Sequence, residues 1–214
     1  MAHDDAGPGM TPRRSPLRMR NEVRILDAAQ HVFAAEGYHG ATIDRIAARA
    51  QMSQPNLHNY FRTKADLYAA VLERTLDVWL GLVDQLDATG DPAVELTRYI
   101  ARKMDLSRQY PEASRVFASE VLRGAPVLKP HIKARVRQNV AHFREVIDGW
   151  IAAGRLRPVD AEHLVFLIWG ATQHYADFLP QIKAIRDVPR LAKADFDAAA
   201  ASIAHIILDG LRPA

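Results

Sequence analysis

The apolar residues of this 214-residue chain recur at the spacing of an α-helix along almost its whole length. Leu, Ile, Val and Ala return every three or four positions, whereas runs of β-branched residues, which are typical of strands, are nearly absent. Gly37, Gly90, Gly124 and Gly154 stand where such segments end, and a proline or a capping side chain opens several of the segments that follow. We therefore predict an all-α fold of about nine helices.

Composition divides the chain into three regions. Residues 1–17 are rich in Gly, Pro, Arg and Asp without an apolar period, which predicts a disordered basic arm. Residues 18–64 are predicted to form a small helical domain, and residues 65–214 a larger helical body. Residues 11–64 carry nine Arg and Lys against four Asp and Glu. This basic end favours a polyanionic partner, although a solvated basic surface would fit the charge equally well.

Several classes of protein do not fit the sequence. No stretch of about 20 apolar residues is present and the N-terminus lacks a signal-peptide core, so a soluble, cytoplasmic protein is expected. The absence of cysteine excludes disulfides, thiolate metal sites and a cysteine nucleophile. No His-x-x-x-His pair, Gly-rich phosphate loop or nucleophile elbow occurs. We therefore expect neither an enzyme nor a bound metal or cofactor.

Two short helices joined by a tight turn are predicted between Thr42 and Phe61. Pro55 falls in the first turn of the second helix, where its missing N–H has no partner to lose. Leu57 and Phe61 face inward, so the polar residues remain outside. This arrangement is a helix-turn-helix, whose second helix enters the major groove of DNA, where polar side chains read base edges and others contact phosphates. The residues assigned to this surface are Thr42, Ser53, Gln54, Asn56, His58, Asn59, Tyr60 and Lys64.

The order of these elements resembles the N-terminal region of the TetR family of bacterial transcription regulators. The family pattern, a first helix ending in F-x-x-x-G-[YF] and a recognition helix closing in Y-F-x-x-K, is present from Phe33 to Tyr38 and from Tyr60 to Lys64. The resemblance spans residues 20–72. Pro55, His58 and Asn59 depart from the residues usual in the family, so the operator sequence is left open.

The resemblance also implies a homodimer. In this family the last two helices, here residues 161–178 and 194–211, pair across a two-fold axis into a four-helix bundle. Two recognition helices about 34 Å apart would then match a palindromic double-stranded DNA operator. The expected apolar contacts between subunits are Leu164, Phe166, Leu167, Ile203, Ile206 and Ile207.

Three runs in the body, DVWL (77–80), YPEASRVFASEVLRGAP (110–126) and IWGATQHYADF (168–178), resemble the RutR-like subgroup, the regulators of pyrimidine utilisation. That resemblance implies a small-molecule effector such as uracil or thymine, which releases a repressor from DNA. A flat base with alternating donors and acceptors needs an aromatic face and an amide. The expected effector-binding residues are Trp79, Phe117, Trp169, Gln173, His174 and Tyr175; for Trp79 and Phe117 plain core packing is an equal alternative.

Two other functions remain open at this point. A TetR-like regulator of a different, amphipathic effector predicts that Gln173→Ala leaves effector binding intact. An architectural DNA-binding protein without a ligand predicts DNA binding that no metabolite alters. The sequence does not decide between a repressor and an activator.

Overall fold

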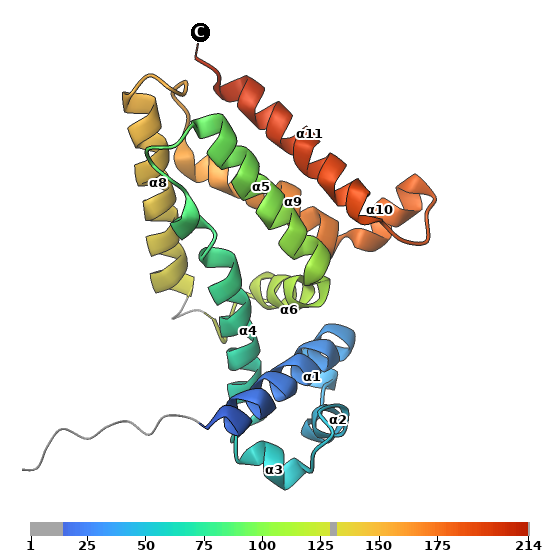
Figure 1. Cartoon of the computed structure of the whole chain (residues 1–214). Coiled ribbons are helices and arrows are strands. Elements are labelled where there is room, and N and C mark those ends of the chain that lie inside the picture. Colours follow the sequence, from blue (N-terminus) through green and yellow to red (C-terminus); the bar gives the residue numbers. More distant parts are fainter. Residues whose placement is uncertain (1–14, 129–131, 214) are drawn as a thin grey trace, which may run out of the picture.

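The computed structural model describes residues 15–128 and 132–213, which form ten α-helices and no strand. The all-α prediction is confirmed. The molecule is elongated, with α1 to α3 at one end, α5 and α8 to α11 at the other, and α4 running between them (Figure 1). The helices are α1 (Pro16–Gly40), α2 (Ile43–Arg49), α3 (Gln54–His58), α4 (Lys64–Leu80), α5 (Pro92–Gln109), α6 (Pro111–Leu122), α8 (Arg137–Ala152), α9 (Ala161–Asp177), α10 (Leu179–Arg186) and α11 (Lys193–Leu211), with short segments η1 (Val83–Gln85) and η2 (Ile132–Val136).

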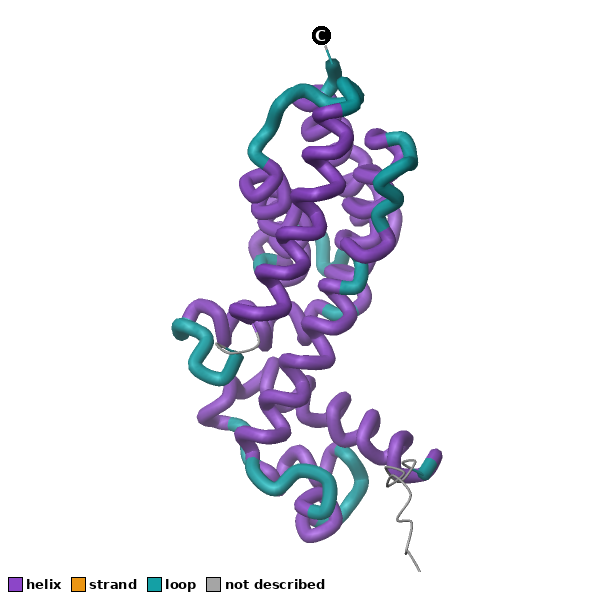
Figure 2. The backbone as a smooth tube through the Cα atoms, turned by 90° about the vertical axis from the view of Figure 1, so that its left-hand side faces the viewer, coloured by secondary structure: helices purple, strands orange, loops and turns teal. Residues whose placement is uncertain are grey.

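The helix ends follow local sequence signals. Ser15 caps α1 by accepting a hydrogen bond from the Arg18 amide, so this helix begins two residues inside the predicted arm, most of which lies outside the described residues. Gly37 has φ +69°, as a glycine near a helix end often does. Thr63 and Asp66 form the predicted capping box at the start of α4. The side view follows these helices and their short connections along the long axis (Figure 2).

The molecule has two apolar cores, which lie next to each other along its long axis. The first, the N-terminal core, contains the buried faces of α1 to α4 together with Val116 and Leu128. The second, the body core, contains the buried faces of α5, α8, α9 and α11, with Val83 and Leu86 from the segment after α4. The buried face of α4 thus packs with the N-terminal helices, although the predicted domain boundary at residue 64 would assign it to the body. The chain passes from one core to the other directly after α4.

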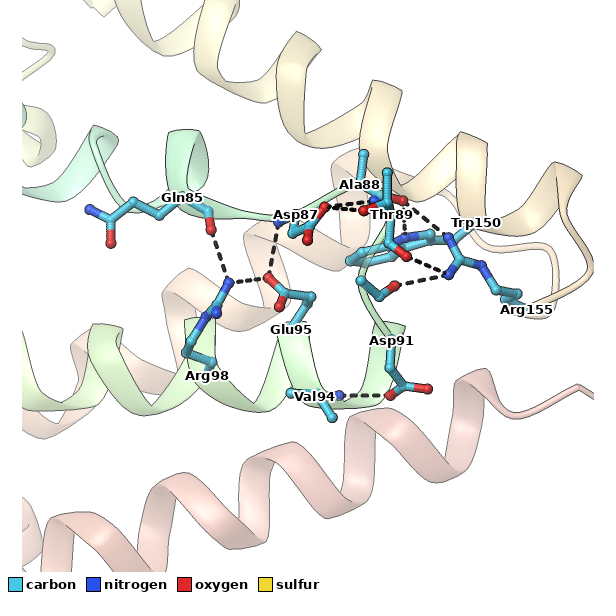
Figure 3. A network of polar contacts seen from close by, with 11 residues as sticks. Gln85, Asp87, Ala88, Thr89, Asp91, Val94, Glu95, Arg98, Trp150 and Arg155 are labelled. Atoms are coloured by element: carbon cyan, nitrogen blue, oxygen red, sulfur yellow. Dashed lines mark hydrogen bonds and ion pairs between the residues drawn. The ribbon is translucent and has the colours of Figure 1, made fainter.

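A polar network fixes the connection between α4 and α5 to the body (Figure 3). The Arg155 guanidinium donates hydrogen bonds to the carbonyl oxygens of residues 88–90, at 2.9–3.2 Å. The Trp150 indole N–H donates to the first of these carbonyls at 2.8 Å. On the other side, Glu95 accepts a hydrogen bond from the amide of residue 87 and pairs with Arg98. Both α5 and the end of α8 therefore hold this connection.

Candidate functional site

The turn between α2 and α3 is tight. Gln51 adopts a left-handed backbone conformation with φ +52°, and the Met52 amide bonds back to the Ala47 carbonyl oxygen. The recognition helix α3 ends at His58, one turn earlier than the sequence predicted. Beyond it the amides of Asn59 and Tyr60 bond to carbonyls three residues back, which tightens the chain into a turn.

The polar side chains of α3 face solvent, as the helix-turn-helix interpretation requires. Gln54, Asn56, His58 and Asn59 are all exposed. Leu57 and Phe61 are buried, which confirms the predicted orientation of the helix. Two of the other predicted DNA contacts cap helices: the Ser53 hydroxyl accepts from the Asn56 amide and the Thr42 hydroxyl from the Arg45 amide. Both capping residues are exposed to solvent.

Two residues in the first two turns of α1 hold Tyr60 in place. The Asn21 side-chain amide donates to the Tyr60 hydroxyl at 2.9 Å, and the Arg18 guanidinium lies 4.8 Å from the centre of the Tyr60 ring. Arg18 also donates to the Asn59 carbonyl oxygen. Because Asn21 is the donor, the phenolic hydrogen of Tyr60 is available for a phosphate oxygen.

Lys64 is half-buried and already has protein partners. Its ammonium donates to the Ala41 carbonyl oxygen at 2.9 Å and lies 4.7 Å from the centre of the Tyr38 ring. These contacts tie the start of α4 to the end of α1. Two N–H groups of the ammonium remain for a phosphate contact.

A cavity of about 290 Å³ lies where α4, α5, α6 and α9 meet. It brings together four of the six residues predicted to bind an effector: Trp79, Phe117, Trp169 and Gln173. The remaining lining residues are Leu76, Leu80, Lys103, Val121 and Val136. The wall is therefore largely apolar, with an amide and an amine as its polar groups.

The aromatic rings of the cavity are held by their neighbours. Trp79 and Phe117 meet edge to face, with ring centres 5.2 Å apart. The Trp169 indole N–H donates to the Tyr99 hydroxyl at 2.9 Å, and burial raises the pKa of that hydroxyl. Within the described part of the chain, no protein group hydrogen-bonds the Gln173 amide. The amide is thus free to pair with a ligand.

His174 and Tyr175 do not line this cavity. His174 is exposed and stacks on Phe178, with ring centres 4.9 Å apart. Tyr175 packs against Phe196 in the body core. Successive residues of a helix point about 100° apart, so the two residues after Gln173 turn away from the cavity. The effector site proposed below leaves both of them out.

Sequence reasoning did not identify Lys103. Its side chain is 5% exposed, and its ammonium lies 5.3 Å from the Trp79 ring centre and 5.7 Å from that of Trp169. Burial lowers the pKa of Lys103 to about 8, while the nearby Asp177 carboxylate acts in the opposite direction. The signal in the sequence is the position of Lys103 among the buried residues of α5, which include Leu96 and Ile100.

The C-terminal helices expose part of the predicted dimer surface. Phe166 and Leu167 on α9 are 50% and 57% exposed, and Ile206 on α11 is 68% exposed. Leu164 and Ile207 were expected in the same surface but are buried in the body core. No helix within residues 15–128 and 132–213 combines the length and the apolar character needed to cross a bilayer.

Comparison with known proteins agrees with these features. Residues 25–71 match the family of bacterial regulatory proteins of the tetR type, and residues 72–214 match the C-terminal region of YcdC-like proteins. The chain is 37% identical to the HTH-type transcriptional regulator RutR of Escherichia coli O157:H7, over 95% of this chain and 96% of that protein.

Solved structures share the fold. A regulatory protein of the tetR family from Rhodococcus RHA1 superposes with a TM-score of 0.73 at 22% identity, covering 91% of this chain and 98% of that one. FadR from Bacillus subtilis, solved in complex with stearoyl-CoA, gives 0.67 at 18% identity, covering 88% and 98%. These relatives are transcriptional regulators rather than enzymes. The chain belongs to the TetR family of bacterial transcriptional regulators and is RutR-like within it.

Proposed function

We propose that this protein is a homodimeric repressor that binds a palindromic operator and is released by a pyrimidine base such as uracil or thymine. The observation that supports a pyrimidine base as the effector is the cavity that two tryptophan rings and the free amide of Gln173 line together. Stacking and paired hydrogen bonds are the two interactions that a flat oxo-pyrimidine requires. The 290 Å³ volume suits a ligand of this size.

DNA binding is assigned to α3 and its flanks. The exposed amides of Gln54 and Asn56 are the side chains best suited to read base edges, and the Tyr60 hydroxyl, which accepts a hydrogen bond from Asn21, is assigned to a phosphate contact. A homodimer through α9 and α11 supplies the second copy of this surface. Its core would contain the exposed Phe166, Leu167 and Ile206 rather than Leu164 and Ile207, which the body core has already buried.

Helix α4 provides the connection between the two sites. Its first residue, Lys64, contacts the end of α1, and its last turn places Trp79 in the cavity wall. A ligand between the rings would tilt this helix and change the spacing of the two recognition helices. Release requires that the ligand bind the tilted state more tightly than the DNA-bound state, and a coupling of about 1 to 3 kcal/mol is usual.

A second candidate function keeps the DNA-binding surface but changes the effector. The cavity wall is mostly apolar, and FadR, which shares the fold, is solved with stearoyl-CoA. An amphipathic effector would therefore also find contacts here. The small volume and the two polar groups at the cavity favour the pyrimidine base.

A fluorescence titration tests the proposal. Uracil and then thymine are added to the purified dimer, and the emission of Trp79 and Trp169 is followed. Trp150 is fully buried away from the cavity and adds a constant background. A saturable change that Gln173→Ala abolishes and the exposed control Gln181→Ala retains is expected. No change up to millimolar base, or binding that survives Gln173→Ala, would favour the amphipathic effector instead.

A further inference from the structure

The ammonium of Lys103 is a buried charge that the protein itself compensates only in part. Among the described residues, no carboxylate lies within ion-pair distance of it. Asp177 on α9 is the acidic group that acts on it, and this carboxylate already accepts a hydrogen bond from Ser114. Arg115 on α6 and His174 on α9 also act on Asp177, so its negative charge is shared among several groups.

The two tryptophan rings provide the remaining stabilisation. Their faces lie within 6 Å of the ammonium, at distances where a cation–π contact is favourable. Such contacts do not supply a hydrogen-bond acceptor, and an ammonium has three donors. Apart from Gln173 and Lys103 itself, the lining residues are aromatic or aliphatic. A ligand that enters this cavity therefore meets a positive charge in a poorly screened environment.

The charge has a consequence for the ligand. An anionic oxygen or ring nitrogen placed beside Lys103 gains a charge-assisted hydrogen bond, whereas a neutral carbonyl gains a weaker one. An amino group in the same position would direct its N–H donors at the N–H donors of the ammonium, and no hydrogen bond would form. The chemistry of the cavity thus discriminates between bases of similar shape by their charge.

We propose that Lys103 makes the cavity selective for an anionic effector, so that among oxo-pyrimidines the rings that most readily lose a proton bind best. This inference rests on the pyrimidine effector proposed above and narrows its class. A neutral base that binds in this way releases the proton of its ring nitrogen to the solvent and forms an ion pair with the Lys103 ammonium. A base that is already an anion releases none.

The test compares three probes of nearly the same shape by calorimetric titration. Uracil is neutral, 5-fluorouracil has a more acidic ring N–H, and barbiturate, a pyrimidine trione, is an anion at neutral pH. We expect affinity to rise in that order, with barbiturate about tenfold to a hundredfold tighter than uracil. Lys103→Gln should remove most of this difference, whereas Arg102→Gln, at the exposed neighbouring position on α5, should preserve it.

A second measurement needs only the wild-type protein. Barbiturate affinity is followed from about pH 6 to about pH 9. It should fall as the pH passes about 8, where Lys103 in the free cavity loses its proton. Equal affinity for the three probes, a ranking that survives Lys103→Gln, or a pH-independent barbiturate affinity would overturn the inference. If uracil nevertheless binds in a Gln173-dependent manner, the proposed function stands without this selectivity; if none of the probes binds, both fail.

Discussion

Replacing Arg155 by Met should reveal how much the hydrogen bonds between Arg155 and the segment after α4 contribute to the stability of the protein. The guanidinium donates to three successive carbonyl oxygens, of residues 88–90, at 3.0, 3.2 and 2.9 Å. Arg155 is half-exposed, so each bond is assigned about 1 kcal/mol rather than the larger value of a buried charged bond. Trp150 retains its own bond to the first carbonyl. The free energy of unfolding should therefore fall by about 2 to 3 kcal/mol.

Urea unfolding followed by far-ultraviolet circular dichroism measures this change. Arg155→Lys is the graded variant, because an ammonium cannot span three carbonyls as the guanidinium fork does, and it should lose roughly half as much. Arg157→Met, at an exposed position two residues further on, is the matched control and should change stability by less than about 0.5 kcal/mol.

The same variant bears on signalling. The proposed signal requires the segment after α4 to act as a fixed support, against which a bound effector tilts α4. When Arg155 no longer holds this segment, α4 should tilt on effector binding without moving the DNA-binding end. Operator affinity without effector should stay within about threefold of wild type, whereas the ratio of affinities with and without effector should shrink toward one. A destabilisation no larger than that of Arg157→Met would refute the proposed anchoring. A destabilised variant with full effector response would refute the fixed support alone.

Three further predictions concern separate parts of the molecule. Tyr60→Phe removes the hydroxyl that is proposed to contact a phosphate and should weaken operator binding up to about tenfold without changing base preference, as a gel-shift series against mutated operators would reveal. Ile206→Glu places a charge in the proposed dimer surface and should give monomers in size-exclusion chromatography; a stable dimer would count against that surface. The pKa of Lys103 is about 8 in the folded protein, against 10.5 in the unfolded chain. Between these two pH values the unfolded chain binds more protons than the folded protein, so the stability of the fold rises with pH. Burial of the charged ammonium therefore costs the most stability below about pH 8. Lys103→Met should therefore raise the free energy of unfolding at pH 7 by up to about 3 kcal/mol, and a gain that does not shrink by pH 10 would contradict the buried ammonium.

Local signals in the sequence predicted much of this structure. The capping box at Thr63, the left-handed Gly37 and the inward direction of Leu57 each depend on residues within a turn of one another. The pairing of Trp169 with Gln173 has the same origin, since residues four apart share a helix face. The sequence therefore anticipated both ends of the proposed signalling path.

Other features depend on which neighbour a helix face meets, and a local pattern does not contain that information. Lys103 is a charged residue that ordinarily marks a solvent-facing position, yet α5 presents it to a cavity closed by three other helices. Leu164 and Phe166 lie two positions apart on α9, and only the packing of the whole body assigns the first to the core and the second to the surface. The early end of α3 likewise follows from turn bonds beyond His58 rather than from helix propensity.

The two cores have a consequence for how the protein melts. Leu76 and Leu80 of the cavity wall belong to the N-terminal core, whereas Trp169 packs against the body core, so the cavity lies along the seam between them. Helix α6 packs against helices of both cores, but an empty cavity leaves the walls that face each other across it without contact. An occupant would add contacts to both at once, so calorimetry should record two overlapping thermal transitions that merge into a single, sharper one as the effector saturates the protein.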